Sequence, residues 1–136
     1  MPMIQTNRGC PFSCTFCQEG QEYFNKVRRH SLKFVQEELN YISKKVRPDA
    51  GLWITDSNWA MYKWDEDIAD HISSLQKNIG WPRELITSTG KAQLERIVRI
   101  AKKLNNSIVK GFKSTLIPVQ PLLYILYVLC VLYSLT

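Results

Sequence analysis

Residues 3–17 read Met-Ile-Gln-Thr-Asn-Arg-Gly-Cys-Pro-Phe-Ser-Cys-Thr-Phe-Cys, a short strand-like stretch at 3–6 followed by a loop with three cysteines. Cys10, Cys14 and Cys17 have the spacing CxxxCxxC. Cysteine thiolates are the usual ligands of iron-sulfur clusters, so each of these three can bind one iron of a 4Fe-4S cluster. The spacing therefore predicts a cluster whose fourth iron has no protein thiolate and can bind a small molecule.

Zinc is the main alternative to an iron-sulfur cluster as the metal bound by this loop. The three cysteines and His30 could form a Cys3His site, because zinc accepts that tetrahedral set. Zinc sites usually combine two pairs of ligands, and here only Cys14 and Cys17 form a CxxC pair. Cys130 lies far along the chain in an apolar run, where a small hydrophobic role fits best. Nothing at the start of the sequence is typical of a secretory signal, so we do not expect a disulfide framework. The spacing favours a cluster over zinc.

The length and charge of the chain limit what it can be. It has 136 residues, with 18 basic and 12 acidic ones and a net charge of +6. That length predicts one domain with a core, although it is small for a barrel. The densest basic groups, at 26–30 and 44–47, are typical of solvated loops and helix ends. We therefore expect a small-molecule cofactor as the partner and do not expect nucleic-acid binding.

Three segments have the apolar spacing of an amphipathic helix. The first begins after Ser31 and the second near Asp65, and both residues are candidate N-caps. The third covers residues 91–105. Gly80, with Pro82 just beyond, is expected to end the second helix, because glycine readily adopts the left-handed C-cap conformation. The apolar positions of the first two helices are Val35, Leu39, Ile42, Val46, Ile68, Ile72, Leu75 and Ile79.

Short strand-like segments lie between these helices. We expect strands at 52–55, at 84–87 and at 113–119, after the first at 3–6. Strands that alternate with helices form a parallel sheet with right-handed crossovers, and sites in such sheets lie at the carboxyl ends of the strands. The cysteine loop follows the first strand, so we expect it at that edge. Trp53, within the second strand, is expected in the core.

The cysteine loop resembles that of the radical S-adenosylmethionine (radical SAM) enzymes, in which an aromatic residue precedes the third cysteine. Here that aromatic residue is Phe16. The resemblance implies that Cys10, Cys14 and Cys17 ligate a 4Fe-4S cluster and that S-adenosyl-L-methionine chelates the open iron. It implies that Phe16 packs near the adenine. It also implies reductive cleavage of the sulfonium to a 5′-deoxyadenosyl radical, with electrons from an external donor.

The same resemblance predicts the architecture. The family core is a partial parallel barrel, so we expect an α/β fold: a partial (β/α) barrel of about three to four units over 1–120, then an apolar tail at 121–136. A nearer likeness, to members with an upstream cobalamin-binding domain, rests on residues 54–63, 80–82 and 88–91. That domain is not present in this sequence. Cobalamin would therefore be bound only through a domain that this chain lacks.

Three more residues are candidate cofactor contacts. After the second strand, many family members have Gly-Gly-Glu, which holds the amino group of the cofactor, whereas this chain has Asp56, Ser57 and Asn58. The aspartate could accept a charge-assisted hydrogen bond from an ammonium group, with Ser57 beside it. Alternatively, Asp56 and Asn58 make the turn through side-chain bonds to the backbone. Ser88, after the third strand, could contact the cofactor or cap the helix that begins near Lys91.

The end of the sequence differs in character, because residues 114–136 carry no charge. A membrane span needs about 20 apolar residues, and the run after Pro121 is shorter unless preceding residues are included. Lys110 and Lys113 would then keep the preceding domain on the cytoplasmic side. We favour an incomplete chain with a non-native continuation over a membrane anchor. The expected location is cytoplasmic, with membrane association through 115–136 as the alternative.

Two functions follow as hypotheses. The first is a radical SAM enzyme, or a fragment of one, whose substrate the sequence does not identify. The second is a non-catalytic zinc-binding module with a Cys3His site, tethered to a membrane or a partner. The resemblance to the radical SAM family implies that substrate contacts come from later strands and added domains.

Overall fold

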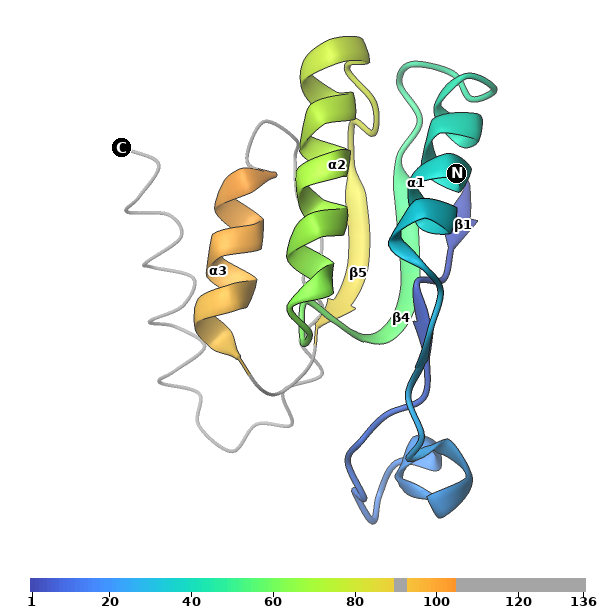
Figure 1. Cartoon of the computed structure of the whole chain (residues 1–136), viewed down its shortest axis with the longest axis vertical. Coiled ribbons are helices and arrows are strands. Elements are labelled where there is room, and N and C mark those ends of the chain that lie inside the picture. Colours follow the sequence, from blue (N-terminus) through green and yellow to red (C-terminus); the bar gives the residue numbers. More distant parts are fainter. Residues whose placement is uncertain (90–92, 105–136) are drawn as a thin grey trace.

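The computed structural model describes residues 1–89 and 93–104, and it has a mixed α/β architecture (Figure 1). A parallel three-stranded sheet has the order β1-β4-β5, and three helices pack side by side against it, α1 against α2 and α2 against α3. The strands are β1 (Met3–Ile4), β4 (Leu52–Trp59) and β5 (Leu85–Thr89), and the helices are α1 (Leu32–Ser43), α2 (Trp64–Ile79) and α3 (Leu94–Lys103). The α/β class with a parallel sheet is thus confirmed, and closure into a partial barrel stays a prediction.

A two-stranded antiparallel ribbon leaves the sheet and carries the cysteine loop. It pairs β2 (Asn7–Arg8) with β3 (Arg28–Arg29), and the loop between them holds two 3-10 turns, η1 (Gln18–Gly20) and η2 (Glu22–Phe24). The strand expected at 3–6 is therefore divided, because the chain changes partner: β1 pairs with β4, whereas the chain after it pairs with β3.

The hydrophobic core lies between the helices and one face of the sheet. Leu52 and Ile54 of β4 are fully buried on that face, together with Leu85 of β5. Trp53 is 41% exposed, so the expectation that it lies in the core was wrong. Successive side chains of a strand point to opposite faces. Trp53 therefore lies on the face that the described helices leave uncovered, where Met3 of the neighbouring strand is 61% exposed.

Two of the expected helix ends are confirmed by their capping geometry. The hydroxyl of Ser31 accepts a hydrogen bond from the backbone N–H of Phe34 at 3.2 Å, as an N-cap residue does. Gly80 has a φ of 72° and donates its N–H to the carbonyl of Gln76. That left-handed conformation carries little steric cost for glycine, so α2 ends there.

The expected cap of the second helix was wrong. Helix α2 begins at Trp64, after Lys63 at the N-cap position, and Asp65 therefore lies within the first turn. Its Oδ2 accepts a hydrogen bond from the backbone N–H of Tyr62 at 2.9 Å. The carboxylate still satisfies an amide at the start of the helix, but it bonds back from inside the helix.

Several predictions from the end of the sequence lie outside the described residues. They are the strand at 113–119, the role of Cys130 and the apolar tail at 121–136. The third helix, expected from about Lys91, begins at Leu94 after Gln93 at the N-cap position. Within the part of the chain that the structure describes, no helix has both the length and the apolar character needed to cross a bilayer. The division at residue 120 stays a prediction.

Two isoleucines of α2 test this description of the core. Ile72 is fully buried, whereas Ile79 is 49% exposed. We expect Ile72→Ala to lower the free energy of unfolding by about 2–5 kcal/mol, because it removes buried apolar surface and leaves a cavity. The matched variant Ile79→Ala should lower it by about 0.5 kcal/mol or less. Urea unfolding followed by circular dichroism measures both, and equal losses would contradict the described core.

Candidate functional site

The cysteine loop occupies residues 9–27, between the two strands of the ribbon. Figure 1 shows it at the same end of the molecule as the carboxyl ends of β4 and β5. In parallel α/β sheets, the ligand site lies at this edge. The loop is therefore where the strand order places a site.

Backbone hydrogen bonds organise the loop around its cysteines. Cys10 donates its N–H to the carbonyl of Phe24 at 2.9 Å, which joins the beginning of the loop to its return. Cys17 donates to the carbonyl of Cys14 at 3.1 Å, and Gly20 donates to the carbonyl of Cys17 at 3.0 Å. The backbone therefore makes two consecutive tight turns, the first from Cys14 to Cys17 and the second from Cys17 to Gly20.

Two glycines make this path sterically feasible. Gly9 has a φ of +99°, and a Cβ there would lie 2.7 Å from the carbonyl oxygen of Phe24. A Cβ on Gly20 would lie 2.1 Å from the carbonyl oxygen of Cys14. Both distances are too short for real carbon-oxygen contacts, so the loop can close only if these two positions carry no side chain.

The loop fits an iron-sulfur cluster by the chemistry of its donors. All three cysteines are thiols rather than disulfide sulfurs, and their exposure increases along the loop: Cys10 is buried, Cys14 is half-buried and Cys17 is exposed. Within 1–89 and 93–104, however, no three His, Cys, Asp or Glu side chains are gathered closely enough to hold a metal ion. Cluster binding would therefore need the thiol side chains to turn toward a common centre.

His30 does not join the thiols in this conformation. Its ring stacks on the ring of Phe34, with 5.1 Å between the centroids, and its backbone N–H donates to the carbonyl of Thr6. A Cys3His zinc site is therefore not assembled among the described residues either.

Asp56 connects the centre of the sheet to the segment that leads into the loop. It is only 1% exposed. Its Oδ1 accepts from the backbone N–H of Thr6 at 2.7 Å and of Asn7 at 3.3 Å. Its Oδ2 accepts from the hydroxyl of Thr6 and from the side-chain amide of Asn7, the latter at 2.8 Å. Burial raises the pKa of Asp56, and the hydrogen bonds from Thr6 act in the opposite direction.

Ser57 makes a second connection, on the far side of the loop. Its hydroxyl donates to Oε1 of Glu19 at 2.6 Å, and Glu19 lies in η1 directly after the third cysteine. Thr6, Asn7 and Glu19 were not among the residues singled out from the sequence. Their position beside the cysteine motif was the only available signal, since no spacing rule connects them to β4.

The other expected cofactor contacts lie apart from these bonds. Phe16 is 66% exposed beside the third cysteine. Ser88 is half-buried in β5, and it does not cap α3, whose N-cap position is Gln93. Contact between a cofactor and Phe16, Asp56, Ser57 or Ser88 stays a prediction.

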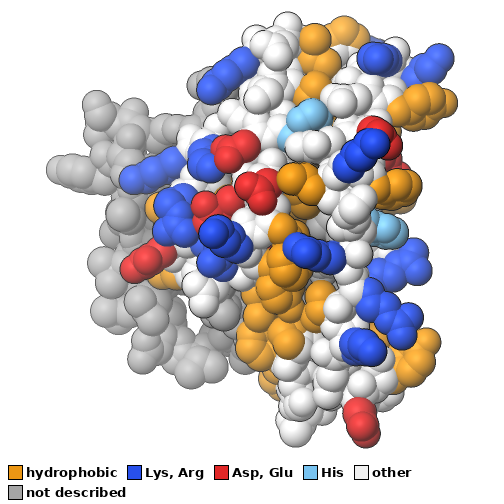
Figure 2. Space-filling model, viewed as in Figure 1, with side chains coloured by type: hydrophobic (Ala, Val, Ile, Leu, Met, Phe, Trp, Pro, Cys, Tyr) orange, Lys and Arg blue, Asp and Glu red, His pale blue; other side chains and the backbone are white. Residues whose placement is uncertain are grey.

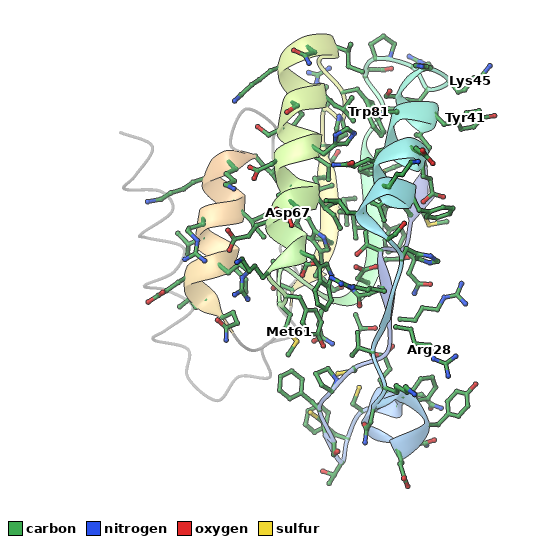
Figure 3. The ribbon with its side chains drawn as sticks, in the orientation of Figure 1. Arg28, Tyr41, Lys45, Met61, Asp67 and Trp81 are labelled. Carbon is green, nitrogen blue, oxygen red and sulfur yellow. The ribbon has the colours of Figure 1, made fainter. Side chains whose placement is uncertain are left out.

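Basic side chains lie beside the return of the loop, on the ribbon and the start of α1. Lys26, Arg28 and Lys33 are exposed on the ribbon and the first turn of α1, and Figure 2 shows blue side chains along this border of the molecule. Figure 3 shows Arg28 pointing away from the ribbon. Arg29 lies over the ring of Trp64, 4.6 Å from its centroid. A positive local field of this kind favours an anionic ligand.

Unusual polar burial marks the carboxyl end of the sheet. Asp65 is fully buried, and its Oδ1 has no hydrogen-bond partner among the described residues. The same holds for Nδ2 of Asn58 and Oγ1 of Thr87. Burial raises the pKa of Asp65 to about 7, and the neighbouring charge of Asp56 acts in the same direction.

Comparison with known proteins finds similarity to methyltransferases. The chain is 30% identical over 98 residues to a cobalamin-dependent radical SAM methyltransferase, TokK, of Streptomyces tokunonensis. It is 29% identical over 98 residues to a 2-(S-pantetheinyl)-carbapenam-3-carboxylate methyltransferase of Streptantibioticus cattleyicolor. A shorter match, 40% identical over 40 residues, is to an uncharacterized methyltransferase of Pyrococcus horikoshii and covers 29% of this chain and 9% of that protein. No family model matches the chain.

These matches cover most of this chain but little of its relatives. Each of the two longer matches spans 72% of the chain, which corresponds to only 14% of the relative. The similarity supports a radical SAM-like protein, and a match of 98 of the 136 residues must include several of the helices and strands.

Gly20→Ala tests the close approach of the two turns. We expect it to lower the free energy of unfolding by about 1–3 kcal/mol, because the new Cβ forces Cys14 away. It should also speed alkylation of the buried Cys10 thiol, measured by mass spectrometry on the reduced, metal-free chain. Gly80→Ala is the control, because a Cβ there meets nothing within 4 Å. It should cost about 1 kcal/mol through its left-handed backbone and leave the Cys10 rate unchanged. Unchanged alkylation in Gly20→Ala would contradict the described loop.

Asp65→Asn tests the buried carboxylate. The folded chain holds the Asp65 proton up to a pKa of about 7, whereas an unfolded chain releases it near its ordinary value of 3.8. Ionisation therefore favours the unfolded state, and the free energy of unfolding should fall as the pH rises from about 4 to about 7. We expect Asp65→Asn to flatten this fall, measured by urea unfolding across that range. Asp67→Asn, exposed on the same helix, should keep the wild-type slope. If Asp65→Asn keeps the wild-type dependence of the free energy of unfolding on pH, the raised pKa of Asp65 is not its cause.

Proposed function

We propose that this chain is the cluster-binding part of a radical SAM enzyme. Cys10, Cys14 and Cys17 would hold a 4Fe-4S cluster, and S-adenosyl-L-methionine would bind at the iron without a protein ligand. The observation that carries the proposal is the CxxxCxxC loop at the carboxyl end of a parallel sheet. Similarity over 98 residues to a protein named a cobalamin-dependent radical SAM methyltransferase supports it.

The protein residues have distinct parts in this proposal. The three thiolates bind the cluster, which when bound supplies the electron for reductive cleavage of the sulfonium. Phe16 is exposed beside the third cysteine, where an aromatic face can pack against an adenine. Ser57 and Ser88 lie near the carboxyl ends of their strands and are half-buried. The hydroxyl of Ser57 donates to Glu19, so a polar ligand at Ser57 would share or replace that hydrogen bond. Lys26 and Arg28 provide positive charge near the loop for an anionic group.

The reaction of the whole protein is a further part of the proposal. We place the radical-generating core within residues 1–120 and propose that it serves a methyltransferase, because the relatives are named methyltransferases. Cobalamin would be bound by a domain outside this chain, and an external donor would supply the electron. The cytoplasm is the expected location, because the cluster and its donor need a reducing compartment.

Cys14→Ala tests the cluster. After anaerobic reconstitution, we expect the wild-type chain to contain iron and acid-labile sulfide in equal amounts and to absorb broadly at the blue end of the visible range. Cys14→Ala should lose most of this absorption and iron, because one of three ligands is gone. Cys130→Ala should retain both, since that cysteine lies outside the motif.

His30→Ala distinguishes the cluster from zinc. A cluster held by the three cysteines predicts that this variant binds as much iron as the wild-type chain. One zinc per chain with no iron or sulfide, released by His30→Ala, would overturn the proposal in favour of a Cys3His zinc module. Metal analysis by mass spectrometry measures both metals in the same samples.

A further inference from the structure

We infer that Asp56 is a positioning residue, which holds the cysteine loop in place on the sheet through Thr6 and Asn7. This inference rests on the proposed function, because it concerns the placement of the proposed cluster ligands. It assigns to Asp56 a role different from contact with a cofactor.

The hydrogen bonds of Asp56 leave it little capacity for a ligand. An ionised carboxylate has about four acceptor sites. Four protein donors already occupy the two oxygens: the backbone N–H groups of Thr6 and Asn7, the hydroxyl of Thr6 and the side-chain amide of Asn7. The carboxylate is also buried, with 1% of its residue surface exposed. A cofactor ammonium would have to displace one of these donors, and the displaced group would then be buried without a partner.

The donors belong to Thr6 and Asn7, which lie at the base of the cysteine loop. Thr6 lies two residues after the end of β1, Asn7 is the first residue of β2, and Asn7 stands three residues before Cys10. The carbonyl of Thr6 accepts the backbone N–H of His30, and Asn7 pairs with Arg29 in the ribbon. The segment that Asp56 holds is therefore in contact with both ends of the loop, its start and its return.

The neighbouring residue holds the loop at another point. Ser57 donates to Glu19 at 2.6 Å, just after Cys17. Consecutive residues of β4 thus contact the segments before the first cysteine and after the third. Two contacts on either side of the motif restrain its rotation as well as its distance from the sheet.

A carboxylate matches the donors of this site, because all four groups that face Asp56 donate. Asparagine would replace one acceptor oxygen with an NH2 donor. That donor would face the side-chain amide of Asn7, which is itself a donor at 2.8 Å from the present oxygen. Asp56→Asn therefore keeps the size of the side chain but breaks some of its hydrogen bonds to Thr6 and Asn7. This variant is the sharpest test of whether those hydrogen bonds hold the loop.

Hydrogen exchange of backbone amides in the metal-free full chain measures how often the loop opens. The backbone amides of Cys10, Cys17 and Gly20 are hydrogen bonded within the loop and report on its opening. In Asp56→Asn we expect these amides to exchange roughly tenfold faster or more, whereas amides inside α2 should change by a smaller factor. Exposed Asp67→Asn on α2 is the control and should leave both sets unchanged. Iron uptake after reconstitution should fall in Asp56→Asn as the loop opens.

A second variant covers the case in which Asp56→Asn does not fold. Glu19→Ala removes only the contact with Ser57, at a half-buried site. It should speed exchange at Cys17 and Gly20 more than at Cys10, which lies nearer the Asp56 contacts. Equal acceleration at all three amides and in α2 would show a general loss of stability and overturn the inference.

The outcomes separate this inference from the proposed function. Loop amides that stay as slow as in the wild-type chain, with weaker binding of S-adenosyl-L-methionine by Asp56→Asn, would assign Asp56 to the cofactor instead. If the wild-type chain takes up no iron, the proposed function fails. The exchange data still decide whether Asp56 holds the loop, because they are collected without any metal.

Discussion

The buried carboxylate of Asp56 joins the two parts of this molecule. It stands on the central strand β4 and accepts hydrogen bonds from Thr6 and Asn7, at the point where the chain leaves the sheet for the ribbon. The ribbon itself has only two residues in each strand, too few to fix the loop by backbone pairing alone. The position of the cysteines relative to the sheet therefore depends on side-chain contacts from β4.

The core changes character along the sheet. At its amino end and centre, β4 and β5 bury aliphatic side chains such as Leu52, Ile54 and Leu85. At its carboxyl end, next to the buried Trp59, several buried residues are polar: Asp56, Asn58, Thr87 and Thr89 of the strands and Asp65 at the start of α2. Burial of ionisable and amide groups costs free energy unless they are hydrogen bonded. This end is thus less stable than an apolar core of the same size, and it is the end at which the loop lies.

Local features of the fold were predictable from the sequence. Ser31 caps α1 and Gly80 ends α2, because each depends on neighbours within one helical turn. Trp53 and Asp65 were misplaced for different reasons. Trp53 lies in a strand as expected, but its face depends on which side the helices cover. Asp65 lies one residue inside the helix, because Trp64 packs against the core and Tyr62 supplies the amide that the carboxylate accepts.

The sequence by itself determined the cysteine spacing and the alternation of strands and helices, since both are properties of residues close along the chain. Only the tertiary structure decided that Asp56 contacts Thr6 and Asn7, and that Ser57 contacts Glu19. These pairs are far apart in sequence and meet because β1 and β4 are neighbours in the sheet. Pairing between distant strands follows from the packing of the whole domain, so no local pattern of residues specifies it.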